Sequence, residues 1–169
     1  MMRAIWIIFF IVGLIGCGSK DSEKKFQGTS ANKNYIDQGM NYLSKGDIKE
    51  AIRSFDEAIR QDPSNPENYI TLGQVYLRLG NPVRAIDSFS AATRVDPFSG
   101  EAYYLLATSN AIDGRMKEAV DSAQKSVEIF MQERNEERFK KSLALLKSLT
   151  ETVQKATMQE QTPPPPTVQ

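Results

Sequence analysis

Few side chains in this sequence could carry out chemistry. The 169 residues contain no histidine and a single cysteine, Cys17. Without an imidazole, neither a histidine-based catalytic triad nor a histidine-ligated zinc site can form. The remaining candidate is a serine and lysine pair, Ser122 and Lys125, which lie about one helical turn apart.

This pair is better explained as part of an ordinary helix. Ala119, Ala123 and Val127 lie at helical spacing around it and already supply an apolar face. The sequence also shows no glycine-rich phosphate loop, no clustered metal ligands and no paired carboxylates within an apolar run. We therefore expect a protein that is not an enzyme, without catalytic residues, a bound metal or a cofactor.

The charge balance argues against nucleic acid as a partner. Lysine and arginine together number 21, and aspartate and glutamate also number 21, so the formal charges cancel. Lys140, Lys141 and Lys147 are close in sequence, but such a run usually marks the solvated face of a helix. We expect a protein partner.

The chain contains an internal repeat with a step of 34 residues. The equivalent positions are Tyr35, Tyr69 and Tyr103; Gly39, Gly73 and Ala107; Gly46, Gly80 and Gly114; and Ala51, Ala85 and Ala119. Each copy contains two helical patterns of apolar residues separated by a glycine. One helical hairpin cannot bury its apolar face alone, so the copies are predicted to stack into an all-α solenoid.

The spacing within the second copy resembles the tetratricopeptide repeat. The matching positions are Tyr69, Leu72, Gly73, Tyr76, Ala85, Phe89, Ala92 and Pro97. The third copy is looser, because Asn110, Ala123 and Met131 replace a tyrosine, a phenylalanine and a proline of the pattern. The resemblance implies a right-handed superhelical solenoid of three hairpins, with repeats at residues 32–65, 66–99 and 100–133.

A further helix is predicted after the third repeat. Residues 136–158 lack glycine and proline, and they follow an expected break near Asn135. Their apolar residues form one stripe that should cap the array, namely Phe139, Leu143, Leu146, Leu149 and Val153. The remaining residues, 159–169, include four consecutive prolines and are predicted to be a disordered tail without a function.

The family resemblance also implies a concave groove lined by the first helix of each repeat. The predicted groove residues are Ile36, Met40, Leu43, Ile70, Gln74, Leu77, Arg78, Tyr104, Thr108 and Ile112. Their largely apolar character favours an extended peptide or a helix of a partner protein. The alternative is that part of this stripe packs between repeats or against the chain's own tails. Ile36 and Met40 stand where repeats that clamp a chaperone's terminal carboxylate carry lysine and asparagine, which argues against that ligand.

The N-terminus has the pattern of a signal peptide, predicted at residues 1–16. Arg3 precedes an apolar run from Ala4 to Ile15. As a helix this run would span roughly 18 Å, which is too short to cross a bilayer core of about 30 Å.

The residues that end this run, Leu14-Ile15-Gly16-Cys17, resemble the lipobox of bacterial lipoproteins. That resemblance implies that Cys17 carries a diacylglyceryl group and an amide-linked acyl chain such as palmitate. Residues 17–31 are polar and are predicted to form a flexible tether. Gly18 replaces the aspartate that marks inner-membrane retention in enteric bacteria, which favours the periplasmic face of the outer membrane if the source is diderm.

These patterns predict a lipid-anchored scaffold that assembles a bacterial envelope complex through protein binding. An adaptor subunit that regulates an envelope enzyme, such as a peptidoglycan hydrolase, is the alternative. The sequence does not rank the possible partners.

We expect Cys17→Ser to release the protein from membranes without unfolding it, because the substitution removes the thiol that would be acylated. Membrane fractionation reports the release, and circular dichroism reports the helical content. Ser19→Ala is the control and should leave the protein in the membrane fraction. Retention of the Cys17→Ser protein in that fraction would contradict the lipid anchor.

Overall fold

The computed structural model describes residues 20–160, with side chains from 33 to 159. Its helices are α1 (Lys20–Lys45), α2 (Ile48–Gln61), α3 (Pro66–Arg78), α4 (Pro82–Val95), α5 (Gly100–Ile112), α6 (Met116–Gln132) and α7 (Glu136–Glu160). No strand occurs within this described range. The predicted signal peptide, Cys17 and residues 161–169 lie outside it.

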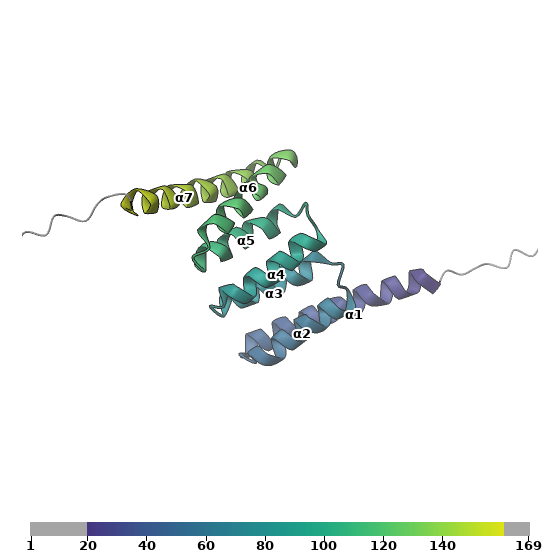
Figure 1. Cartoon of the computed structure of the whole chain (residues 1–169). Coiled ribbons are helices and arrows are strands. Elements are labelled where there is room, and N and C mark those ends of the chain that lie inside the picture. Colours follow the sequence, from purple (N-terminus) through teal and green to yellow (C-terminus); the bar gives the residue numbers. More distant parts are fainter. Residues whose placement is uncertain (1–19, 161–169) are drawn as a thin grey trace, which may run out of the picture.

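The helices are arranged as three stacked hairpins with a final helix on one end (Figure 1). The hairpins are α1–α2, α3–α4 and α5–α6, and α7 packs on α6. The all-α solenoid predicted from the sequence is therefore confirmed. Within residues 20–160, no helix combines the length and the hydropathy needed to cross a bilayer.

In the first two hairpins, a phenylalanine ring packs directly on a glycine of the partner helix. A Cβ atom on Gly73 would lie 2.6 Å from Cε1 of Phe89, and one on Gly39 would lie 2.7 Å from Cε1 of Phe55. Both rings are completely buried. Glycine is therefore required at these helix positions because any side chain would occupy the space of the ring.

The third hairpin makes the same kind of contact at a different place. Ala107 and Ala123 occupy the positions of the glycine and the phenylalanine, and both are fully buried. Phe130, seven residues after Ala123, packs instead on Gly100, where a Cβ atom would lie 2.8 Å from the ring. The contact has thus moved two helical turns along the antiparallel pair, which explains why the third copy matches the repeat pattern less well.

The turns within the hairpins end in a left-handed glycine. At Gly80, φ is 68°, its N–H donates to the carbonyl of Leu77 at 3.0 Å, and the N–H of Asn81 donates to that of Tyr76 at 2.9 Å. These paired bonds satisfy the last carbonyls of α3 in a Schellman motif. Gly46 and Gly114 have the same conformation, with φ of 82° and 81°.

Arg134 makes the same turn between α6 and α7, although it is not glycine. Its φ is 56°, its N–H donates to the carbonyl of Met131 at 3.2 Å, and the N–H of Asn135 donates to that of Phe130 at 3.1 Å. The predicted break near Asn135 is confirmed. This joint has the turn used inside hairpins, whereas the Asp-Pro joints link successive hairpins.

The α6–α7 joint also shifts the repeat register by two residues. The side chains of Asn65, Ser99 and Asn135 each accept a hydrogen bond from a backbone N–H of the following helix, at 3.1, 3.2 and 3.2 Å. The first two caps are 34 residues apart, and the second and third are 36 apart. As a result, Ser142 on α7 takes the place that Leu72 and Leu106 occupy on α3 and α5.

The shift changes which face of α7 is buried. Leu149 is 6% exposed, and Leu145 and Leu146 pack against the same cluster, whereas Leu143 is 45% exposed. The predicted capping stripe is therefore wrong at Leu143 and at Val153, since Val153 is 36% exposed. The physical reason is Ser142, which is fully buried with its hydroxyl 2.8 Å from that of Ser126 and turns α7 toward α6.

The predicted flexible tether is also wrong from Lys20 onward, because α1 begins there. Residues 20–45 contain no proline, and extending an existing helix adds a hydrogen bond for each residue without a second nucleation step. The N-terminal part of α1 extends beyond α2 (Figure 1).

We expect Gly73→Ala to lower the free energy of unfolding by about 1–2 kcal/mol, since crowding the Phe89 ring outweighs the better helix propensity of alanine. Urea denaturation followed by circular dichroism measures the change. Gln74→Ala, at the exposed neighbouring position, is the matched control and should have little effect. Equal stability of the two variants would contradict the ring contact.

Arg134→Gly should raise the free energy of unfolding by about 0.5–1 kcal/mol, because glycine adopts the left-handed conformation without steric cost. The same urea titration measures it. Arg134→Ala keeps the Cβ atom and should give no gain. A gain of the same size in both variants would show that the arginine side chain, not the backbone conformation, is responsible.

Candidate functional site

The predicted groove residues lie on α1, α3 and α5, and they differ in accessibility. Met40 and Ile112 are 46% and 61% exposed, and Gln74 and Arg78 are also exposed. The half-buried members are Ile36, Leu43, Leu77, Tyr104 and Thr108. The Thr108 hydroxyl donates to the Tyr104 carbonyl at 2.9 Å, so it is engaged within its own helix.

Ile70 is a correction, because its side chain is only 2% exposed and belongs to the hydrophobic core. Ile36, Leu43 and Leu77 pack against the same core. The central hairpin has a neighbour on each side, and the core that contains Ile70 extends from residues of α1 to residues of α5. The alternative left open by the sequence, packing between repeats, therefore applies to Ile70 and in part to these three neighbours.

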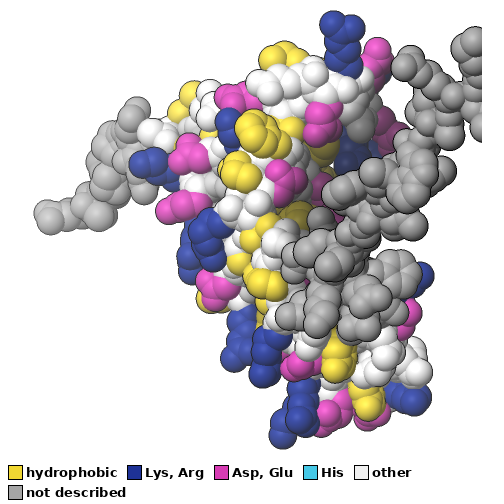
Figure 2. Space-filling model, turned by 90° about the vertical axis from the view of Figure 1, so that its right-hand side faces the viewer, with side chains coloured by type: hydrophobic (Ala, Val, Ile, Leu, Met, Phe, Trp, Pro, Cys, Tyr) yellow, Lys and Arg dark blue, Asp and Glu magenta, His cyan; other side chains and the backbone are white. Residues whose placement is uncertain are grey.

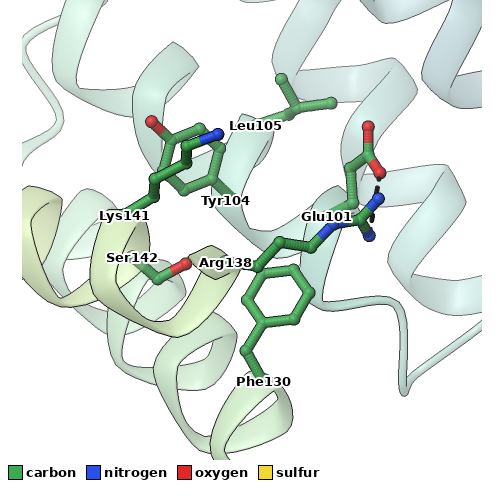
Figure 3. A pocket seen from close by; sticks show the side chains of 7 residues that line it. All are labelled: Glu101, Tyr104, Leu105, Phe130, Arg138, Lys141 and Ser142. Atoms are coloured by element: carbon green, nitrogen blue, oxygen red, sulfur yellow. Dashed lines mark ion pairs between the residues drawn. The ribbon is translucent and has the colours of Figure 1, made fainter. Parts of the chain in front are cut away.

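A pocket of about 200 Å³ lies where α5, α6 and α7 meet (Figure 3). Its lining residues are Glu101, Tyr104, Leu105, Phe130, Arg138, Lys141 and Ser142. Of these, the sequence prediction of the groove included Tyr104. The residues of α6 and α7 were not predicted, because α7 was expected only to cover the end of the array. The N-cap residues Asn65, Ser99 and Asn135 are equivalent, however, and they indicate that α7 continues the array.

Arg138 lies at the rim of this pocket and makes two interactions there. Its Nη1 lies 3.4 Å from Oε2 of Glu101, and its guanidinium carbon lies 5.6 Å from the centroid of the Phe130 ring. Both members of the ion pair are about half exposed, so the pair stabilises the fold by less than about 1 kcal/mol. The ring and the carboxylate together place the guanidinium over the pocket.

Lys141 is the second cation at the rim, and its side chain extends alongside Tyr104 (Figure 3). Its Nζ donates to Oε1 of Glu137, one turn earlier on α7, at 2.7 Å. This hydrogen bond lowers the pKa of Glu137 and raises the pKa of Lys141 relative to their ordinary values. Both groups are therefore fully charged near neutral pH.

The structure does not bring the candidate serine and lysine together. The Ser122 hydroxyl donates to the carbonyl of Glu118 at 2.8 Å, and Lys125 Nζ donates to Oε2 of Glu128 at 3.2 Å. Among the described residues, no group of three potential metal ligands is placed around a common point. No buried side-chain oxygen or nitrogen in this part of the chain lacks a hydrogen-bond partner.

The surface is divided into small regions of different character. On the face in Figure 2, hydrophobic side chains form separate patches between charged side chains of both signs. A surface of this kind suits a ligand that makes a few apolar contacts along its length better than one that covers a single broad apolar area.

Comparisons with known proteins agree with this architecture. Residues 42–108 match a family model described as tetratricopeptide repeat. A search of curated protein sequences finds no match. Among solved structures, the chain is similar to the tetratricopeptide-repeat domain of Sgt2 from Aspergillus fumigatus, with 21% identity and a TM-score of 0.65 over 82% of this chain and 88% of that one.

Two similar structures contain a bound partner. The TPR2B domain of yeast Sti1, in complex with pHsp70, has 18% identity and a TM-score of 0.65 over 73% of this chain and 98% of that one. PcrH of Pseudomonas aeruginosa, in complex with the chaperone binding region of PopD, has 17% identity and a TM-score of 0.63 over 71% and 91%. At these identities the likeness establishes the fold.

Proposed function

Since the described chain folds as a tetratricopeptide-repeat solenoid, we propose that it is a scaffold that binds a segment of a partner protein in its groove. The observation that carries this proposal is the row of exposed side chains on the first helices of the hairpins, at Met40, Gln74, Arg78 and Ile112. These helices share one side of the stack, so a single bound segment would contact all three hairpins.

The mixed chemistry of the row indicates the kind of segment. Met40 and Ile112 are exposed apolar side chains near the two ends, and Gln74 and Arg78 lie between them. Such an arrangement favours a peptide or a helix with spaced apolar residues and polar residues between them. The complexes of Sti1 with pHsp70 and of PcrH with a region of PopD support the use of this fold for protein segments.

We further propose that the scaffold is anchored to a membrane through acylated Cys17, on the periplasmic face of the outer membrane if the source is diderm. The support is the sequence pattern from Leu14 to Cys17. Because α1 begins three residues after Cys17, the helix itself acts as the spacer. The part of α1 that precedes the first repeat, residues 20–31, corresponds to about 18 Å.

An anchored array with a groove suits the assembly of an envelope complex, in which one bound protein is held near the membrane. The same groove would serve an adaptor that regulates an envelope enzyme such as a peptidoglycan hydrolase. The identity of the captured partner distinguishes the two roles, since an assembly scaffold retains a structural component and an adaptor retains a hydrolase.

The test is capture of the partner from native membranes with tagged full-length protein, comparing Met40→Glu with Val83→Glu. The two side chains are 46% and 45% exposed, but Val83 lies at the start of α4, outside the groove. Burying a charge against an apolar contact should reduce the recovered partner at least about tenfold for Met40→Glu. Val83→Glu should match the unaltered protein.

Equal recovery by the two variants would contradict binding in the groove. Circular dichroism of both proteins provides the folding control, because an exposed substitution should leave the helical content unchanged.

A further inference from the structure

We infer that the pocket between α5 and α7 binds one apolar side chain of the partner segment, followed in that segment by an acidic residue. This inference rests on the proposed function and names the chemistry of one end of the groove. It concerns residues that α6 and α7 contribute, none of which was among the predicted groove residues, and those of α7 lie outside the three predicted repeats.

The pocket has a small residue in its lining at a position where the array otherwise carries a leucine. Leu72 and Leu106 are 6% and 9% exposed and fill their positions in the core. The residue equivalent to Leu106 after the 36-residue step is Ser142, whose short side chain points to Ser126. Ser142 lines the pocket but is fully buried, so a ligand would mainly contact the more accessible lining residues of α5 and α7.

The walls of this space suit an apolar side chain of moderate size. Leu105, Tyr104 and the ring of Phe130 line it, and the Ser142 hydroxyl is already paired with that of Ser126. A volume of about 200 Å³ accommodates one leucine, methionine or phenylalanine side chain. Burial of such a side chain accounts for about a tenfold gain in affinity or more.

The rim supplies donors for a carboxylate next to that side chain. A guanidinium has five N–H donors and an ammonium has three. Arg138 pairs with Glu101 through Nη1, and Lys141 donates one hydrogen bond to Glu137, so both cations keep donors for a further acceptor. The exposed pair of Arg138 with Glu101, at 3.4 Å, is also weak enough to exchange for a ligand carboxylate.

The rim contains two carboxylates and two cations, Glu101, Glu137, Arg138 and Lys141, and is thus balanced in charge before a ligand arrives. The arrangement is nevertheless asymmetric, because Glu137 is not among the lining residues whereas both cations are. An incoming acidic residue can therefore accept hydrogen bonds from both cations, at a rim without net charge. A basic residue at the same place would find one lining carboxylate, Glu101, which already pairs with Arg138.

The binding test uses the full chain in detergent micelles and three blocked peptides of ten residues in a glycine and serine background. The first carries one leucine followed by two aspartates, the second replaces the leucine with alanine, and the third replaces the aspartates with asparagines. Titration followed by amide NMR should show shifts at Leu105, Phe130 and Ser142 with the first peptide. The second and third should bind at least about tenfold more weakly.

Lys141→Glu and Lys140→Glu form a matched pair of variants. Each lysine is exposed and pairs with a glutamate four residues earlier, Glu137 or Glu136, but Lys140 does not line the pocket. Lys141→Glu should weaken binding of the first peptide at least about tenfold, and Lys140→Glu should leave it unchanged. Equal effects of the two variants would overturn the inference.

The remaining outcomes separate this inference from the proposed function. Absence of shifts at the pocket residues, or shifts confined to the surroundings of Met40 and Gln74, would overturn the pocket. If Lys141→Glu captures the native partner normally while Met40→Glu does not, the pocket is likewise rejected and groove binding stands. If both variants capture it normally, the proposed function fails as well.

Discussion

The structure depends on the packing of phenylalanine rings against helical glycines. Phe55 on Gly39 and Phe89 on Gly73 let the two helices of a hairpin approach until their backbones are separated by one aromatic ring. Alanines of the same hairpin, such as Ala85 and Ala92, are fully buried in the hydrophobic core. The third hairpin keeps the contact by moving it to Gly100 and Phe130, so the same constraint is met with a different sequence pattern.

Much of this fold could be predicted from the sequence, because residues that recur at a fixed step occupy equivalent places in the structure. Glycines and alanines that recur every 34 residues identify the close contacts and the turns, and the hairpins follow from them. The start of the first helix could not be predicted from the sequence pattern. Nothing in the composition of residues 20–31 requires a helix, and their helical state follows from the packed helix that they extend.

The candidate site was predicted less completely, for two physical reasons. The same position differs in burial between hairpins, because Ile70 in the central hairpin is buried in the core, whereas its equivalents Ile36 and Tyr104 are half-buried. The two extra residues before α7 also break the 34-residue step. They rotate that helix and place Ser142 inside and Leu143 outside, next to the pocket that Ser142 helps to line.

The buried hydroxyls at the end of the array fix the position of its last helix. Ser126 donates to the carbonyl of Gly100 at 2.8 Å, and the Ser142 hydroxyl lies 2.8 Å from that of Ser126, so one chain of polar atoms joins α5, α6 and α7. The apolar contacts of Leu146 and Leu149 would tolerate sliding, since they have little directional preference. The serine chain would not, because sliding by one residue would leave a hydroxyl without an acceptor or donor in a dry interior. The two serine hydroxyls thereby fix the register of α7 against α6.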